Sequence, residues 1–189
     1  SRESEPGGGS KAEAAGAAGA RGGVVVIWGM TTSTFTFVHV LLSLIGIGSG
    51  IVVLIGLLVD APLPGWTALF LVTTVATSVT GFGFPFDHLL PSHVVGLVSL
   101  AVLALVIVAR YSLHLTGAWR RVYVVGAALA LYLNVFVAIV QAFQKFPTLR
   151  ALAPHQTESP FLLAQGVALA LFVVLSVLAA KRFRGASIA

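Results

Sequence analysis

Five long apolar segments alternate with short polar connections along the chain. They cover approximately residues 36–59, 66–84, 93–108, 122–143 and 161–180. A helix needs about 20 apolar residues to cross the hydrocarbon core of a membrane, which is about 30 Å thick. The segments are apolar on all sides, which favours helices over the alternating strands of a membrane barrel. The pattern predicts an all-α polytopic membrane protein with a bundle of five transmembrane helices, or four such helices and one peripheral helix.

The first 29 residues differ from the rest of the chain. Residues 1–23 consist largely of Gly, Ala, Ser and charged residues without an apolar period, which is typical of disorder. They also lack the apolar core of a signal peptide. Met30 is the single methionine and stands just before the first apolar segment, which suggests a natural translation start. We therefore expect a disordered extension over residues 1–29, a transmembrane helical domain over 30–184 and a short tail over 185–189.

Basic residues stand at the ends of the apolar segments. The chain is 58% hydrophobic and 9% charged, with a net charge of +5. This placement assigns the positive charge to membrane topology and argues against a nucleic-acid partner. With five crossings, six Lys and Arg residues near segment ends lie on the side of the C-terminus and three on the other side. The positive-inside rule predicts a cytoplasmic C-terminus and an N-terminus outside, in a bacterial inner membrane.

Motifs for familiar chemistry are absent from the sequence. The chain has no cysteine, which excludes disulfides, iron–sulfur clusters and cysteine nucleophiles. It also lacks a P-loop and the GxGxxG and GxSxG patterns. The sequence therefore does not favour an enzyme, and no catalytic residue is predicted.

The first apolar segment carries a stripe of polar and small residues. His39, Ser43, Gly46 and Gly50 are separated by 4, 3 and 4 residues, so they share one face of a helix. Gly46 and Gly50 form a GxxxG pair, which lets two helices approach closely in lipid. The stripe should face another helix, either inside the chain or in a second copy or membrane-protein partner that packs on the Gly46 and Gly50 face.

Other apolar segments also carry amides on one face. Asn134 and Gln141 lie seven residues apart in the fourth segment, and Gln165 lies in the fifth. Polar side chains in lipid need internal partners. We therefore predict a polar pocket near the outer face that contains His39, Asn134, Gln141 and Gln165.

The turn between the second and third segments concentrates ionisable groups. Asp87, His88 and His93 occur within it or at its end. Ionisable residues at membrane depth are costly and often mark function. A b-type haem would use His39 and His93, the one pair of histidines at matching depth within segments. A divalent metal would draw on His39, His88, His93 and Asp87, although no fixed ligand spacing supports it. A proton or solute pathway would use His39 as its titrating group.

Three stretches resemble a known group of proteins. TGFGFPFDHLLPSH at 80–93, LYLNVFV at 131–137 and QAFQKFPTLRALAP at 141–154 are similar to a group of small bacterial integral membrane proteins of uncharacterised function. The resemblance covers about residues 33–184 and implies a membrane domain without implying an activity.

From the polar pocket, the sequence predicts a small-solute or proton transport or sensing protein. The alternatives are a haem-binding electron-transfer protein and a structural subunit of a membrane complex.

Overall fold

The computed structural model describes residues 26, 27, 29–84 and 91–184, and this part of the chain is predominantly helical. Its helices are α2 (Thr32–Leu58), α3 (Pro64–Gly81), α4 (Pro91–Ile107), the π-helical turn η1 (Val108–Ser112), α5 (Trp119–Lys145), α6 (Pro147–Leu152) and α7 (Ser159–Arg182). Prolines occupy the first turns of α3, α6 and α7, where the missing N–H costs no hydrogen bond. The short helix α6 interrupts the 145–160 connection and was not expected from the sequence.

A two-stranded hairpin precedes the first long helix. Strand β1 (Val26–Ile27) pairs antiparallel with β2 (Met30–Thr31). Among the described residues, this hairpin is the first regular structure, and the β-branched residues Val26 and Ile27 favour a strand. Of the predicted disordered extension 1–29, residues 26, 27 and 29 belong to this hairpin, while residues 1–25 and 28 and the predicted tail at 185–189 lie outside the described residues.

Four helices in the described part of the chain are long and apolar enough to cross a membrane. They are Thr32–Leu58, His93–Ser112, Trp119–Lys145 and Ser159–Arg182. The chain is thus a multi-pass helical protein suited to a lipid bilayer, as the sequence predicted. The second predicted span corresponds to α3, which is not among the four. This 18-residue helix carries several threonines, and their hydroxyls lower its mean hydropathy.

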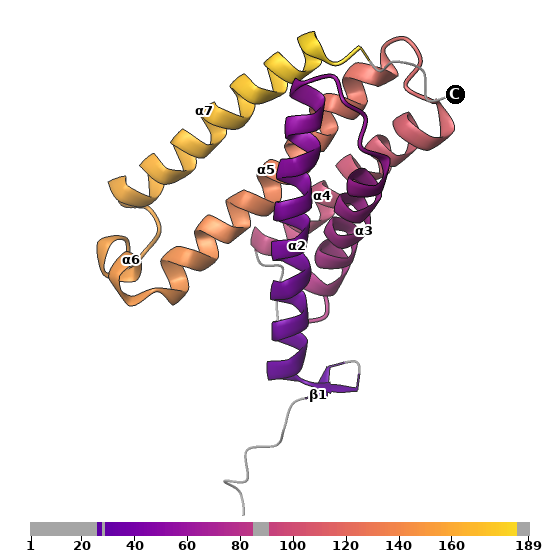
Figure 1. Ribbon diagram of the computed structural model, residues 1–189. Helices are drawn as coiled ribbons and strands as arrows, with labels where there is room; N and C mark the ends of the chain where they lie inside the picture. The colour runs from indigo at the N-terminus through magenta and orange to yellow at the C-terminus, as the bar shows by residue number, and fades with distance from the viewer. Residues whose placement is uncertain (1–25, 28, 85–90, 185–189) are drawn as a thin grey trace, which may run out of the picture.

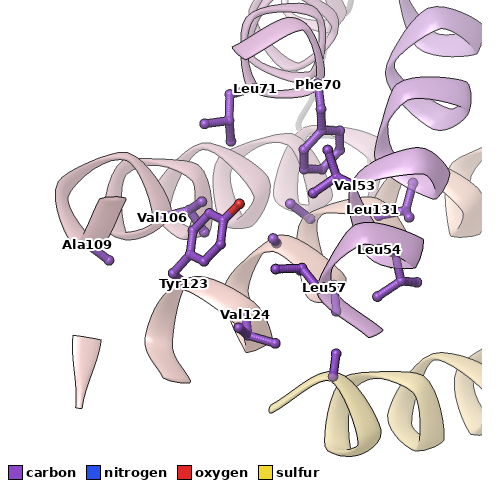
Figure 2. Close-up of a cluster of buried hydrophobic side chains, with 14 of the residues drawn as sticks. Val53, Leu54, Leu57, Phe70, Leu71, Val106, Ala109, Tyr123, Val124 and Leu131 are labelled. Atoms are coloured by element: carbon purple, nitrogen blue, oxygen red, sulfur yellow. The ribbon is translucent and has the colours of Figure 1, made fainter. Parts of the chain in front are cut away.

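The helices form a bundle with one diverging arm. Helix α3 packs against α2 and α4, and α5 packs against α2, α4 and α7. Figure 1 shows α5 leaving the bundle as it runs toward α6, with α7 returning along it. The main core lies where α5 is still close to α2, α3 and α4. Figure 2 shows Tyr123 there among Val106, Leu71 and Val124. Farther along α5, a smaller cluster contains Phe143, Ala153 and Phe161.

Two glycines of α2 let its neighbours approach closely. A Cβ at Gly50 would lie 2.6 Å from Leu131 Cδ1 and 2.8 Å from Phe70 Cε2. At Gly46 it would lie 3.3 Å from both Asn134 Nδ2 and Thr74 Oγ1. The predicted packing role of this face is therefore met within the chain, by α3 and α5. This corrects the idea that a second copy or a partner protein packs on the Gly46 and Gly50 face, because that face is already filled.

We expect Gly50→Ala to destabilise the protein by about 1–3 kcal/mol, the usual cost of overpacking a close contact. The contacting atoms belong to Phe70 and Leu131, both almost fully buried, so neither side chain can move aside freely. The measurement is the free energy of unfolding in mixed micelles titrated with SDS.

Gly48→Ala is the matched control for this substitution. A Cβ at Gly48 meets nothing within 4 Å, and alanine is the better helix former. The control should therefore be neutral or slightly stabilising. Equal destabilisation by both substitutions would contradict the close approach at Gly50.

Candidate functional site

Helix α3 supplies the largest set of buried polar side chains in the described structure. Its buried residues include the hydroxyl residues Thr67, Thr73, Thr74, Thr77 and Ser78. Several hydroxyls of α3 donate to the helix's own backbone, as when Thr73 Oγ1 donates to Leu69 O at 2.7 Å. These local bonds satisfy donors that lipid would leave unpaired. The helix thereby places a row of oxygen atoms inside the bundle.

A polar contact in the middle of the bundle joins α3 to α5. The Asn134 amide nitrogen Nδ2 donates to Thr74 Oγ1 at 3.2 Å, and both side chains are buried. Gly46 lies beside this pair. Because glycine has no side chain, both polar atoms have room to approach α2 here. The predicted inward direction of Asn134 and of the glycine stripe is thus seen in the structure.

His39, on α2, lies beside the C-terminal end of α3 and is half-buried. Its Nδ1 atom forms a 2.8 Å hydrogen bond with Thr80 Oγ1. Its ring meets the ring of Phe84 edge to face, with 5.3 Å between centroids. Thr80 also donates to the carbonyl of Ala76 at 2.7 Å, so its hydroxyl accepts from the imidazole when Nδ1 carries the proton. His39 is therefore oriented through one ring nitrogen, in the way that second-shell groups orient functional histidines.

His93 is also near this end and is buried. Its ring lies against Phe82, with 5.6 Å between centroids. Close by, Ser78 on α3 donates to Ser99 on α4 at 3.1 Å. His39 thus contacts Phe84 and His93 contacts Phe82, and both phenylalanines come just after the end of α3. Asp87 and His88, the other predicted metal ligands, lie outside the described residues.

The structure does not gather all four members of the predicted pocket. Within the described residues, His39 bonds to Thr80 and not to Asn134, Gln141 or Gln165. Gln165 is buried between α7 and α5, where its Nε2 donates to Phe136 O at 3.2 Å. Gln141 is exposed. The reason is the divergence of α5 (Figure 1), which carries Gln141 away from α2. Sequence periodicity shows which residues share a helix face, but it does not show where a helix leaves the bundle.

Sequence reasoning missed a polar cluster at the opposite end of α3. Arg110 is buried and its Nη1 donates to Tyr123 Oη at 3.2 Å. Tyr123 Oη lies 3.4 Å from Thr67 Oγ1. The guanidinium also lies over the rings of Tyr123 and Tyr111, at 5.3 and 5.7 Å from their centroids, a favourable placement for a cation.

The π-helical turn η1 explains how Arg110 comes to lie inside. A π turn inserts an extra residue, which rotates the residues that follow and often marks a functional position. In the sequence Arg110 looks like any basic residue at the end of an apolar segment, where it indicates only topology. The sequence signal for a buried Arg110 is Tyr123, 13 residues later, because a buried tyrosine hydroxyl usually has a hydrogen-bond partner.

A charged turn precedes α7, outside the apolar spans. Glu158 Oε1 accepts from the backbone N–H of His155 at 3.1 Å and lies 3.0 Å from its Nδ1, and Oε2 accepts from Thr157 N–H at 3.0 Å. Desolvation raises the pKa of the Glu158 carboxyl, but the backbone and His155 hydrogen bonds outweigh it and lower this pKa to about 2. Glu158 is therefore ionised at neutral pH and orders this turn.

No protein-family model, curated protein or solved structure matches the chain. The function must therefore be argued from the geometry. Among the described residues, no three His, Asp or Glu side chains gather as metal ligands would. What the described residues offer is the hydroxyl face of α3, with His39 at one end and Arg110 at the other.

We expect Tyr123→Phe to lower the free energy of unfolding by about 1–3 kcal/mol. The substitution keeps the ring beneath Arg110 and removes the hydroxyl that accepts the guanidinium N–H, so it leaves a buried charged donor unpaired. Unfolding in mixed micelles measures the loss.

Tyr111→Phe is the control, because its ring also lies near Arg110 but the residue is 51% exposed. Its effect should stay within about 0.5 kcal/mol. A Tyr123→Phe protein as stable as the control would show that the buried hydroxyl does not stabilise Arg110.

Proposed function

We propose that α3 is a fifth transmembrane helix. Helix α2 lies alongside α3 over the whole length of α3. At one end Gly56 of α2 lies beside Leu63, and at the other end Phe35 of α2 lies beside Gly83. The 21 helical steps from residue 35 to residue 56 correspond to about 32 Å at 1.5 Å per residue. That length matches a hydrocarbon core of about 30 Å. The low hydropathy of α3 is compatible with this role, because its threonines face the bundle rather than lipid.

With five spans, the turn at 60–65 and the C-terminus share one side. The backbone supports this pairing, since Arg184 N–H donates to Asp60 Oδ1 at 2.8 Å. We propose that this side is cytoplasmic, because the basic residues Arg110, Arg120 and Lys181 lie toward it. His39 and the turn before α4 then lie toward the outside of an inner membrane.

We propose further that the protein carries protons, or a small polar solute with them, along the buried face of α3. The observation that carries this proposal is a row of polar groups along the buried face of α3, with an ionisable residue at each end. From outside to inside its members are His39, Thr80, Thr77, Thr74 with Asn134, and then Thr67 with Tyr123 and Arg110. In this row the Thr77 hydroxyl oxygen is buried without a partner in the described structure. Such an atom is available to a passing water or solute.

The row is interrupted on the inner side by apolar packing. Phe70 and Leu71 lie between Thr67 and Thr74 and are 1% and 3% exposed. Figure 2 shows both side chains pointing into the core formed with α2 and α5. The seven-residue step from Thr67 to Thr74 rises about 10 Å, too far for a direct proton transfer. We therefore interpret this structure as a closed state, in which Phe70 and Leu71 separate the two polar ends.

The haem alternative uses the same histidines. The bond from His39 Nδ1 to Thr80 leaves Nε2 as the nitrogen that would bind iron, which is the usual division of roles. His93, however, lies against Phe82 while His39 lies against Phe84. A haem would require these two imidazoles to face each other across one iron.

Single cysteines test the five-span topology, because the natural sequence contains none. In intact cells we expect a membrane-impermeant maleimide to label Asp87→Cys and Arg150→Cys. Pro62→Cys should be labelled only after the membrane is opened. If Pro62→Cys and Asp87→Cys were labelled from the same side, α3 would not cross the bilayer.

Proton flux tests the transport proposal. Purified protein is placed in vesicles that contain a pH-sensitive dye, and a potassium diffusion potential drives proton entry. We expect flux above that of protein-free vesicles, and a decrease of about ten-fold or more in His39→Gln. Glutamine can still hydrogen bond to Thr80 but cannot carry a proton at neutral pH.

His155→Gln is the matched control, since His155 is an exposed histidine outside the row, and it should retain the wild-type flux. Flux equal to that of empty vesicles, or unchanged in His39→Gln, would contradict the proposal. An absorption spectrum of the same sample separates the alternative, because a Soret band lost in both His39→Ala and His93→Ala would indicate haem.

A further inference from the structure

A groove of about 690 Å³ lies between α5 and α7, away from the polar row of α3. Its lining comes only from these two helices. Toward the start of α5 and the end of α7 it is bordered by Arg120, Arg121 and Lys181. The rest of its lining is almost entirely apolar. The groove thus has a cationic mouth at the end of the helices and an apolar body at membrane depth.

The mouth carries three positive charges and no acidic residue among the groove-lining side chains. Arg120 is held in place because its Nη1 donates to Arg184 O at 2.8 Å. Its Nε atom is buried and has no partner among the described residues. Arg120 therefore keeps a fixed, unpaired donor in an environment that already concentrates positive charge. An anion would neutralise this charge and accept from that donor.

The body has the dimensions and chemistry of an acyl chain site. The α5 side of the groove extends from Arg120 to Tyr132, about 18 Å of helix at 1.5 Å per residue. Small side chains, including those of Ala128 and Ser176, leave space between the two helices unfilled along this length. The rings of Tyr132 and Phe172, with 5.8 Å between centroids, mark its deep end.

We propose that this groove binds one anionic phospholipid, with its phosphate at Arg120, Arg121 and Lys181 and an acyl chain along the apolar body. Basic pockets between transmembrane helices recognise anionic headgroups in this way. A zwitterionic lipid fits less well because no carboxylate lines the mouth to receive its ammonium group. A second copy of the chain packed groove to groove would bring three more cations to the same place, so it is also disfavoured.

Native mass spectrometry of the full chain in detergent tests the proposal. The probes are dioleoyl phosphatidylglycerol and dioleoyl phosphatidylcholine, which have the same acyl chains. We expect one phosphatidylglycerol to bind at least about ten-fold more tightly than phosphatidylcholine, because each basic residue near a headgroup contributes roughly five-fold.

The variant Arg121→Gln with Lys181→Gln removes two exposed charges and spares Arg120, which also binds the backbone of Arg184. We expect it to weaken phosphatidylglycerol binding by about 25-fold without changing phosphatidylcholine binding. The matched control, Lys145→Gln with Arg150→Gln, removes two exposed charges, one at the far end of α5 and one on α6, and should bind like the wild type.

Val173→Trp separates a seated lipid from simple attraction of a headgroup. The large ring would fill the body of the groove and leave all three cations in place, so binding should fall at least ten-fold. Equal affinity for the two lipids, equal loss in both charge variants, or full binding by Val173→Trp would each overturn the proposal. The helix content of every variant is checked by circular dichroism before binding is compared, so that unfolding is distinguished from loss of lipid binding.

Discussion

Lipid offers no hydrogen bonds, so each polar group at membrane depth must find its partner inside the protein. Helix α3 shows how this constraint organises the bundle. Its hydroxyls bond to its own carbonyls, to Ser99 on α4, to Asn134 on α5 and to Tyr123. A helix with this composition cannot lie in lipid with its polar face outward. Its polar face must be covered, and α2, α4 and α5 cover it.

Enclosing α3 imposes conditions on its neighbours. Helix α2 can approach only where side chains are missing, and Gly46 and Gly50 stand where α3 and α5 come closest. Gly126 has the same role between α5 and α4, since a Cβ there would lie 2.5 Å from Val106 Cγ2. Toward its C-terminal end α5 diverges from α2, and α7 runs alongside it (Figure 1).

Much of the fold could be predicted from the sequence because apolar length and stripe direction are local properties. The helices, the inward direction of Asn134 and the close packing of the glycine stripe were available in this way. The partner of His39, the exposure of Gln141 and the burial of Arg110 were not. Each depends on the angle between helices or on the extra residue in η1, and neither has a periodic signal. An arginine at the end of an apolar segment has the same sequence appearance whether it faces headgroups or turns inward.

The buried Arg110 also bears on how the α3 row can work. Arg110 places a positive charge beside Tyr123, at the end of the row away from His39. The rings of Tyr111 and Tyr123 and one hydroxyl stabilise that charge, but they do not cancel its field. A cation arriving from His39 would meet this field just after the apolar barrier of Phe70 and Leu71. Both obstacles lie on the same side of Asn134, so in the proposed proton movement along α3 the slowest step would be at the Arg110 end, and His39 would govern entry at the other end.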